Sequence, residues 1–258
     1  MLKIKNKIYK ILVLIIIIPI ITIFIQSVIL RYEYKSLLPD SISLISFKNF
    51  FTSDYIKLLL SSIFMSIIAS ILTIIVSMPL AKVLSEVSIK IKNNLYVILI
   101  TPLLIPQFVY FYGMQNVFMK LNIINTYIGV ILSHIIIMMP YAIINISNDM
   151  SLYGKKYTEV AYVMGVSDIR LYIDIILPII KKTIINTFAL LFIISFSQYL
   201  ITIIIGGGVV KTYAMYLLPL ILGNDRNYAA KATVIYVFIN VFMYMVFINS
   251  KREEINEK

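Results

Sequence analysis

The chain has 258 residues, of which 60% are hydrophobic and 14% are charged, and its formal net charge is +11. Soluble domains carry about 25% charged residues, so this composition indicates a protein embedded in a membrane. There is no cysteine, which excludes disulfides, thiol catalysis and cysteine metal sites. The Lys and Arg residues lie at the ends of apolar runs, as orientation charges at a membrane surface do, and this scatter argues against a nucleic-acid partner.

Six apolar runs are long enough to cross a bilayer, which takes about 20 residues each. They lie at about 11–30, 58–81, 95–118, 127–147, 183–205 and 229–249. We therefore predict an all-α integral membrane protein of about six transmembrane helices, with one domain over residues 1–258. The basic start of the first run also fits the n-region of a signal peptide. An uncleaved anchor is favoured, because the run is long for a signal peptide and no Ala-x-Ala site follows it.

The second run places five small polar residues on one helical face. Their spacing of three or four residues suits close helix packing in lipid, and lining of a pathway is the alternative. The residues are Ser62, Ser66, Ser70, Thr73 and Ser77. In the third and fourth runs, Pro102, Pro106 and Pro140 predict kinks.

His134, the only histidine, lies in the fourth run. A polar group within a span is a functional candidate by default. A single interhelical hydrogen bond is the more common role of a lone histidine, and a substrate role is the alternative. No second histidine or acid accompanies it in the sequence, so we expect no metal site there.

A polar segment, residues 148–182, separates the fourth and fifth runs and is longer than helix connections usually are. Val160 and Ala161 belong to a short amphipathic stretch that ends at Gly165, which suits the left-handed residue after a helix. Ser167 then suits the cap of a second short helix, and Pro178 predicts a stop or bend before the fifth run. This pattern predicts two short exposed helices that contact a partner.

The distribution of Lys and Arg predicts the orientation of the chain. With the N-terminus inside, the inner segments hold fifteen basic residues and the outer segments hold eight. The positive-inside rule therefore predicts that both termini and residues 148–182 are cytoplasmic.

The fifth run contains the most polar cluster of any span, formed by Ser195, Ser197, Gln198 and Tyr199. Because these side chains are neutral, they offer no counter-charge to a strongly cationic solute. The three glycines that follow, residues 206–208, are not followed by Gly-Lys-Ser/Thr, so they predict an outward-facing turn and not a phosphate loop.

The polar segment resembles the EAA loop of binding-protein-dependent ABC importer permeases. The matching residues are Glu159, Ala161, Gly165, Ile175, Leu177 and Pro178, with Val160 where a second alanine is usual. The resemblance extends from about residue 58. The segment Ser195 to Tyr199 and the glycines at 206–207 are similar to the polyamine/thiamine/iron-type branch.

This resemblance implies a transmembrane permease subunit that forms half of a solute pathway in the bacterial plasma membrane and catalyses no reaction. It implies that residues 159–178, through the EAA positions and Val160, contact a separate ATPase, which uses the ATP, so the chain itself binds no cofactor. The other implied partners are a second permease subunit, either a copy or a paralogue, an extracellular or periplasmic solute-binding protein, and membrane lipid.

Two other classes remain as alternatives at this point. A membrane-embedded enzyme needs positioned acids or bases, and the sequence shows no convergent set of them. An ion-gradient-driven secondary transporter usually has ionisable residues within its spans or paired broken helices, and neither is clear in this sequence.

Overall fold

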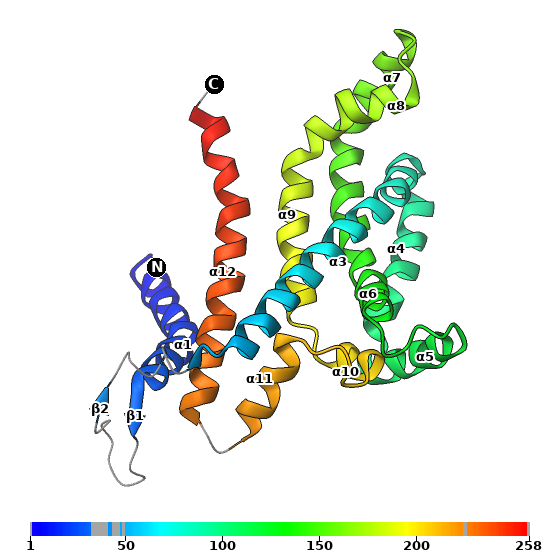
Figure 1. The fold of residues 1–258 in the computed structure, drawn as a ribbon. Coiled ribbons are helices and arrows are strands. Elements are labelled where there is room, and N and C mark those ends of the chain that lie inside the picture. Colours follow the sequence, from blue (N-terminus) through cyan, green and yellow to red (C-terminus); the bar gives the residue numbers. More distant parts are fainter. Residues whose placement is uncertain (1, 32–40, 43–46, 48–49, 224–225, 257–258) are drawn as a thin grey trace. The chain divides into compact units, whose positions relative to one another are not determined.

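The computed structural model describes residues 2–31, 41–42, 47, 50–223 and 226–256, and most of these residues are helical (Figure 1). The strands β1 and β2 form an antiparallel pair in which Ile29 lies opposite Ile42. The elements in chain order are α1 (Leu2–Val28), β1 (Ile29–Arg31), β2 (Ser41–Ile42), α3 (Ser53–Glu86), α4 (Ile89–Leu104), α5 (Gln107–Lys120), α6 (Tyr127–Asp149), η1 (Met150–Gly154), α7 (Lys155–Val163), α8 (Asp168–Arg170), η2 (Leu171–Ile176), α9 (Leu177–Phe196), α10 (Leu200–Gly206), α11 (Tyr213–Leu222) and α12 (Arg226–Asn256).

Among the described residues, four helical stretches are long and apolar enough to cross a membrane. They are Asp54–Glu86, Tyr127–Leu152, Leu171–Phe196 and Arg226–Phe247, and the bent pair α4 and α5 would make a fifth. These agree with an all-helical membrane protein. The first of the six predicted spans, 11–30, corresponds to a shorter apolar stretch, Val13–Val28, so its crossing stays a prediction.

The kink predicted at Pro106 in the run 95–118 is present as a sharp break between two helices. Residues Lys90–Leu104 and Gln107–Lys120 form two helices that meet at an angle of 94°. Pro106 explains the break, because a proline disfavours the helical conformation of the residue before it. Ile105 accordingly has an extended backbone, with φ −75° and ψ 137°. Pro102 and Pro140 lie inside helices α4 and α6, respectively.

The fifth span also differs from its predicted bounds of 183–205. It runs through η2 and α9, from Leu171 to Phe196, and α10 is a separate short helix. Of the two effects predicted for Pro178, a stop does not occur, because Pro178 lies in the first turn of α9, and a bend there stays a prediction. The N–H of Leu177 donates to the carbonyl of Tyr172, five residues earlier. This wider π-helical turn continues the chain into a proline that an ordinary helix interior would not accept.

The chain divides into two compact units, and each is described by itself. The first comprises residues 1–59 and 215–241. Its aromatic core contains Phe50, whose ring centroid lies 4.5 Å from that of Tyr55 and 4.5 Å from that of Tyr228. The single-domain reading of residues 1–258 stays a prediction.

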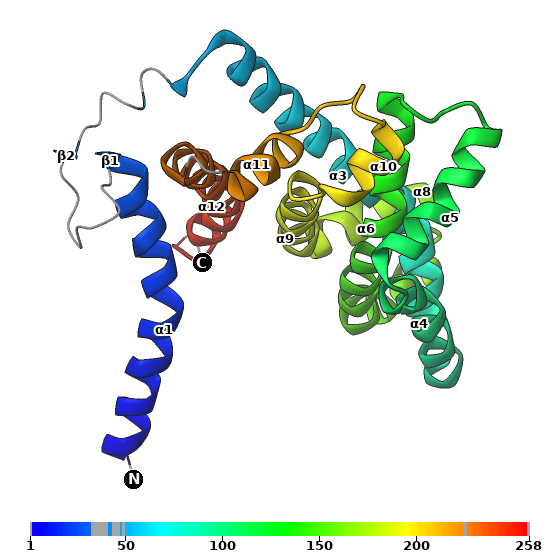
Figure 2. The same cartoon turned by 90° about the horizontal axis from the view of Figure 1, so that it is seen from below.

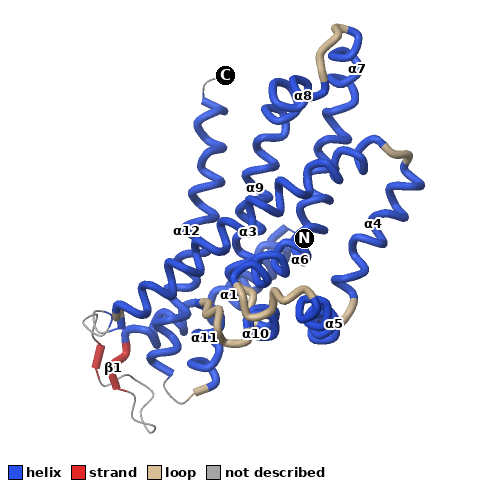
Figure 3. Tube along the Cα trace, turned by 45° about the vertical axis from the view of Figure 1, so that its right-hand side comes forward, coloured by secondary structure: helices blue, strands red, loops and turns tan. Residues whose placement is uncertain are grey.

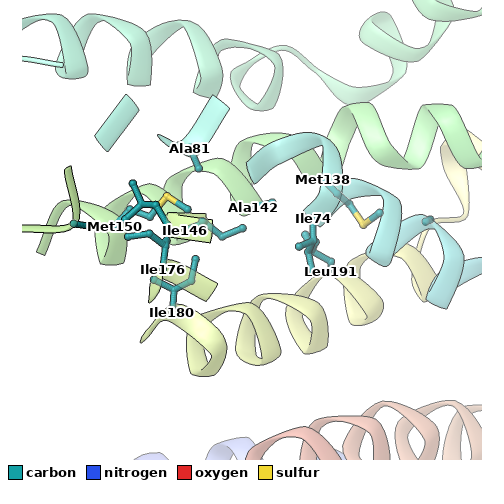
Figure 4. Close-up of a cluster of buried hydrophobic side chains, with 12 residues drawn as sticks. Ile74, Ala81, Met138, Ala142, Ile146, Met150, Ile176, Ile180 and Leu191 are labelled. Carbon is teal, nitrogen blue, oxygen red and sulfur yellow. The ribbon is translucent and has the colours of Figure 1, made fainter. Parts of the chain in front are cut away.

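The second unit comprises residues 60–214 and 242–258 and is built on the contact between α6 and α9. The α7–α8 turn lies at one end of this helix pair and α10 lies at the other end (Figures 1 and 3). Figure 2 shows α5 beside α10 on the same side of α6. The core between α6 and α9 is apolar, and it contains Ala142 and Ile146 of α6 together with Ile180 and Leu191 of α9 (Figure 4).

All five small polar residues of the second predicted span are buried along α3. Ser62 accepts a hydrogen bond from the backbone N–H of Tyr213 at 2.8 Å. Ser70 and Thr73 donate to carbonyls of their own helix. This burial favours the close-packing interpretation of the stripe over pathway lining.

Candidate functional site

The turn between α7 and α8 reverses the chain by a helix-ending motif that the sequence predicted. Gly165 has a φ of +72°, and the N–H of Val166 donates to the carbonyl of Ala161 at 3.0 Å. A left-handed glycine with this six-to-one hydrogen bond is the Schellman arrangement. Ala161 is buried, and Val166 packs against the same apolar cluster, so the apolar contact that accompanies the motif is present too.

The two faces of this turn differ sharply in exposure. The inner face belongs to the core, where Ala161 is 2% exposed and Leu171 is 1% exposed. The outer face is open and includes three large apolar side chains, with Val163 90% exposed, Met164 76% exposed and Ile169 73% exposed, beside the exposed Ser167 and Arg170. We call the three apolar residues the apolar tip. They lie between the candidate spans Tyr127–Leu152 and Leu171–Phe196, outside both.

The residues predicted to contact a partner do not all lie on the apolar tip. Val160 is exposed on α7, whereas Ala161 is buried beneath the turn. Glu159 lies in α7, and its side chain is outside the described part of the structure. Ile175 packs against the core, while Leu177 and Pro178 begin α9. The motif residues thus divide between α7, which leads into the turn, and the segment from η2 to the start of α9, which packs on the core.

Several contacts join residues 148–151 and Tyr172, on either side of the turn, to neighbouring helices. Lys92 of α4 donates to Ser151 of η1 at 2.7 Å. The hydroxyl of Tyr96 donates to Oδ1 of Asn148 at 2.6 Å. A hydrogen bond also joins Thr183 of α9 to Asp149, and the ammonium of Lys82 lies 5.0 Å from the ring centroid of Tyr172. Sequence reasoning missed these contacts, because each of them joins residues that are far apart in the chain.

A second polar site surrounds His134, near the other end of α6. The imidazole is 1% exposed. Its Nδ1 lies 2.9 Å from Oγ of Ser195 in α9, and its Nε2 lies 3.1 Å from Oγ1 of Thr202 in α10. The predicted interhelical hydrogen bond is therefore present at both ring nitrogens. Thr202 was not among the predicted residues, although its position seven residues after Ser195 was a usable signal.

The other residues of the predicted polar cluster do not contact His134 through any hydrogen bond described in the structure. Ser197 is exposed, and its hydroxyl donates to the carbonyls of Ile193 and Ile194. Gln198 and Tyr199 are half-buried in the break between α9 and α10. The structure therefore brings His134 and Ser195 together and leaves the other three on the neighbouring segment.

Gly206 ends α10, and the next two glycines form the turn that the sequence predicted. Gly207 and Gly208 have φ values of +54° and +78°. A Cβ on Gly207 would lie 1.9 Å from Oδ1 of Asn125, so close approach also requires glycine here. Among the described residues, no group of three or more His, Asp or Glu side chains gathers as metal ligands would.

Comparison with known proteins shows what the chain is similar to. Residues 76–250 match the family described as binding-protein-dependent transport system inner membrane component. The chain is 23% identical over 212 residues to a probable transport system permease protein, NifC, of Clostridium pasteurianum, covering 76% of this chain and 74% of the relative.

A second relative and a solved structure agree with this match. The chain is 22% identical over 190 residues to a probable ABC transporter permease protein, PH1036, of Pyrococcus horikoshii, covering 72% of this chain and 69% of the relative. Its fold resembles a chain from the crystal structure of a bacterial alginate ABC transporter in complex with an alginate pentasaccharide-bound periplasmic protein. The TM-score is 0.65 at 17% identity, with 95% of this chain and 94% of that chain covered.

Proposed function

The chain belongs to the family of binding-protein-dependent transport system inner membrane components, and from this premise we propose that its apolar tip contacts the ATPase of the transporter. The chain is the permease subunit of a binding-protein-dependent ABC importer and is not itself catalytic. It is a multi-pass inner membrane protein that works in a complex with a periplasmic binding protein and other ABC transporter subunits. The contact of residues 148–182 with the ATPase is what we propose beyond this.

The observation that carries the proposal is the exposure of the apolar tip. Exposed apolar side chains within the spans are covered by lipid, but Val163, Met164 and Ile169 lie outside the spans. Large apolar side chains exposed in one turn outside the bilayer are typical of a protein interaction site. An ATPase subunit on the cytoplasmic side is the partner that this family offers at such a position.

The packing behind the tip explains how contact would become motion. Ala161 and Leu171 belong to the same buried cluster as Ile146 of α6 and Ile180 of α9 (Figure 4). A close-packed cluster resists compression, so displacement of the tip transfers to both helices as rigid-body movement. Nucleotide-driven closure of the ATPase would in this way move the two spans that carry His134 and Ser195.

Three finer assignments complete the proposal. The second permease subunit is a copy of this chain or a paralogue, and both termini of this chain are cytoplasmic. The chain falls in the polyamine/thiamine/iron-type branch, which the segment Ser195 to Tyr199 supports. The solute path runs past Ser195, Ser197, Gln198 and Tyr199, with His134 behind them, and these neutral residues disfavour a strongly cationic solute.

Replacing Val163 or Met164 of the apolar tip with Asp tests the contact with the ATPase. An unpaired charge buried in an interface costs about 3–5 kcal/mol, so we expect the ATPase yield on co-purification in mild detergent to fall at least severalfold. Val209→Asp is the matched control, because Val209 is also an exposed valine, 65% accessible, in a turn after a helix. Undiminished ATPase recovery with Val163→Asp and Met164→Asp would contradict the proposal.

A further inference from the structure

The path from α9 to α10 is interrupted by three residues, 197–199, that lack regular helix structure. A break of this kind leaves backbone groups without helical partners, and such groups need other hydrogen-bond partners when they are buried. The break therefore needs support from a neighbouring element. His134 of α6 is placed to give it, because its partners Ser195 and Thr202 lie before and after the break.

The hydrogen bonds around Thr202 define which nitrogen of His134 carries the proton. The hydroxyl of Thr202 donates to the carbonyl of Gln198 at 2.8 Å. A threonine hydroxyl has one proton to donate, so at the 3.1 Å contact it must accept from Nε2–H of His134. In a neutral ring Nδ1 is then an acceptor, and it receives the hydroxyl proton of Ser195.

The result is a linked series of hydrogen bonds across the break. Ser195 donates to the imidazole, the imidazole donates to Thr202, and Thr202 donates to the carbonyl of Gln198 within the break. All members of the series are satisfied, and both hydroxyls and the ring are buried. A fully satisfied buried network of this kind specifies one arrangement of the elements that it joins.

We propose that His134 is a positioning residue that fixes the conformation of the break between α9 and α10. Through Ser195 and Thr202 it determines how Ser197, Gln198 and Tyr199 are presented to the transported solute. Both ring nitrogens are used within the protein, so His134 acts through these residues and not by direct contact. The inference rests on the permease assignment for its consequence, but it concerns the conformation of one segment and is independent of the apolar tip.

Because the chain has no cysteine, single cysteines introduced into the full-length protein in native membranes test this directly. Ser197→Cys reports on the break, because Ser197 is exposed there. Ser70→Cys reports on general loosening, because Ser70 is fully buried in α3. The measurement is the rate of modification of each thiol by N-ethylmaleimide, which needs no knowledge of the solute.

With His134→Ala, we expect the thiol at position 197 to react at least about fivefold faster, because one lost hydrogen bond of typical net strength gives that change and the substitution removes two. His134→Gln should restore a rate close to that of the wild type, since a glutamine amide can donate at the position of Nε2. Ser133→Ala is the matched control. Ser133 is also buried, but its hydroxyl donates only to Val130 of its own helix.

Three results would overturn the proposal. One is an unchanged rate at position 197 in His134→Ala, and another is an equal rise at position 70, which would indicate general loosening. The third is an equal rise in Ser133→Ala. If His134→Ala does not accumulate in the membrane, Thr202→Val replaces it, because this variant removes the hydrogen bond from Nε2 of His134. The thiol at position 197 should then also react faster than in the wild type. A failure in any of these tests leaves the ATPase contact of the apolar tip standing, because that contact is measured by co-purification.

Discussion

Gly165 and Gly113 both have open space where a Cβ would lie, but their backbones differ. Gly165 has a φ of +72°, whereas Gly113 lies within α5 without a positive φ. Gly165→Ala should therefore cost roughly 1–2 kcal/mol, the price of a left-handed conformation for an L-residue. Gly113→Ala should stabilise its helix by about 0.5–1 kcal/mol, because glycine is unfavourable in a helix interior.

Thermal unfolding of the two variants in detergent measures this difference, and the opposite signs are the expected outcome. The two substitutions add the same methyl group into open space, so a difference in steric crowding does not explain a difference in stability between the variants. Equal destabilisation by both variants would contradict the left-handed turn at Gly165. A loss of ATPase co-purification with Gly165→Ala alone is also expected, since the turn holds Val163 and Met164 of the apolar tip in position.

At the residue scale, the sequence reveals local requirements better than distant contacts. Gly165 was predictable, because a glycine after an amphipathic stretch has a local physical reason. The two partners of His134 were not, because Ser195 and Thr202 lie 61 and 68 residues away in the chain. A lone histidine in an apolar run indicates a need for polar partners but does not identify them.

Two π-helical segments, η1 and η2, flank the turn that carries the apolar tip. Such wide turns are often found at functional sites, and they have fewer regular hydrogen bonds than an α-helix. The hydrogen bonds from Lys92 to Ser151 and from Tyr96 to Asn148 join α4 to η1 and to the end of α6 just before it. We expect these bonds to limit the opening of η1.

Replacing Lys92 with Met and Tyr96 with Phe removes both bonds and keeps most of the apolar volume. Amide hydrogen exchange in residues 148–154 should then accelerate by roughly fivefold for each hydrogen bond lost. Thr101→Val is the control, because Thr101 of α4 donates only to Val97 of the same helix. Exchange in 148–154 that does not change in the double variant would show that α4 does not restrain η1.

The sequence predicted the bounds of an element where a long apolar run determines them. It did not predict them where the conformation of a single turn determines where a helix ends. The long apolar runs predicted α3 and α6 within a few residues. The same rule for proline did not distinguish Pro106, where the chain breaks, from Pro102 and Pro140, which lie inside helices. Whether a proline breaks a helix depends on how neighbouring elements satisfy the freed carbonyls, and a single sequence does not contain that information.

At the scale of the second unit, its two candidate sites lie toward opposite ends of the α6–α9 pair (Figure 3). The apolar tip follows α6 through η1, while His134 contacts Ser195 of α9 and Thr202 of α10. Between them lies an apolar cluster in which Ile146 and Leu191 are fully buried, and the same two helices also bury the hydroxyls of Ser147 and Thr187. Motion of the tip would therefore reach the break between α9 and α10 through contiguous packing.

The orientation of the whole chain is testable with two single cysteines. Val163 and Val209 are 90% and 65% exposed, and one crossing stretch, Leu171–Phe196, lies between them in the chain. The bias of Lys and Arg places residues 148–182 inside, so a cysteine at 163 should react with a membrane-impermeant maleimide only after the membrane is opened. A cysteine at 209 should react in intact cells. Labelling of both positions from the same side would show that Leu171–Phe196 does not cross the membrane. Labelling of position 163 alone in intact cells would reverse the orientation and exclude a cytoplasmic ATPase as the partner of the apolar tip.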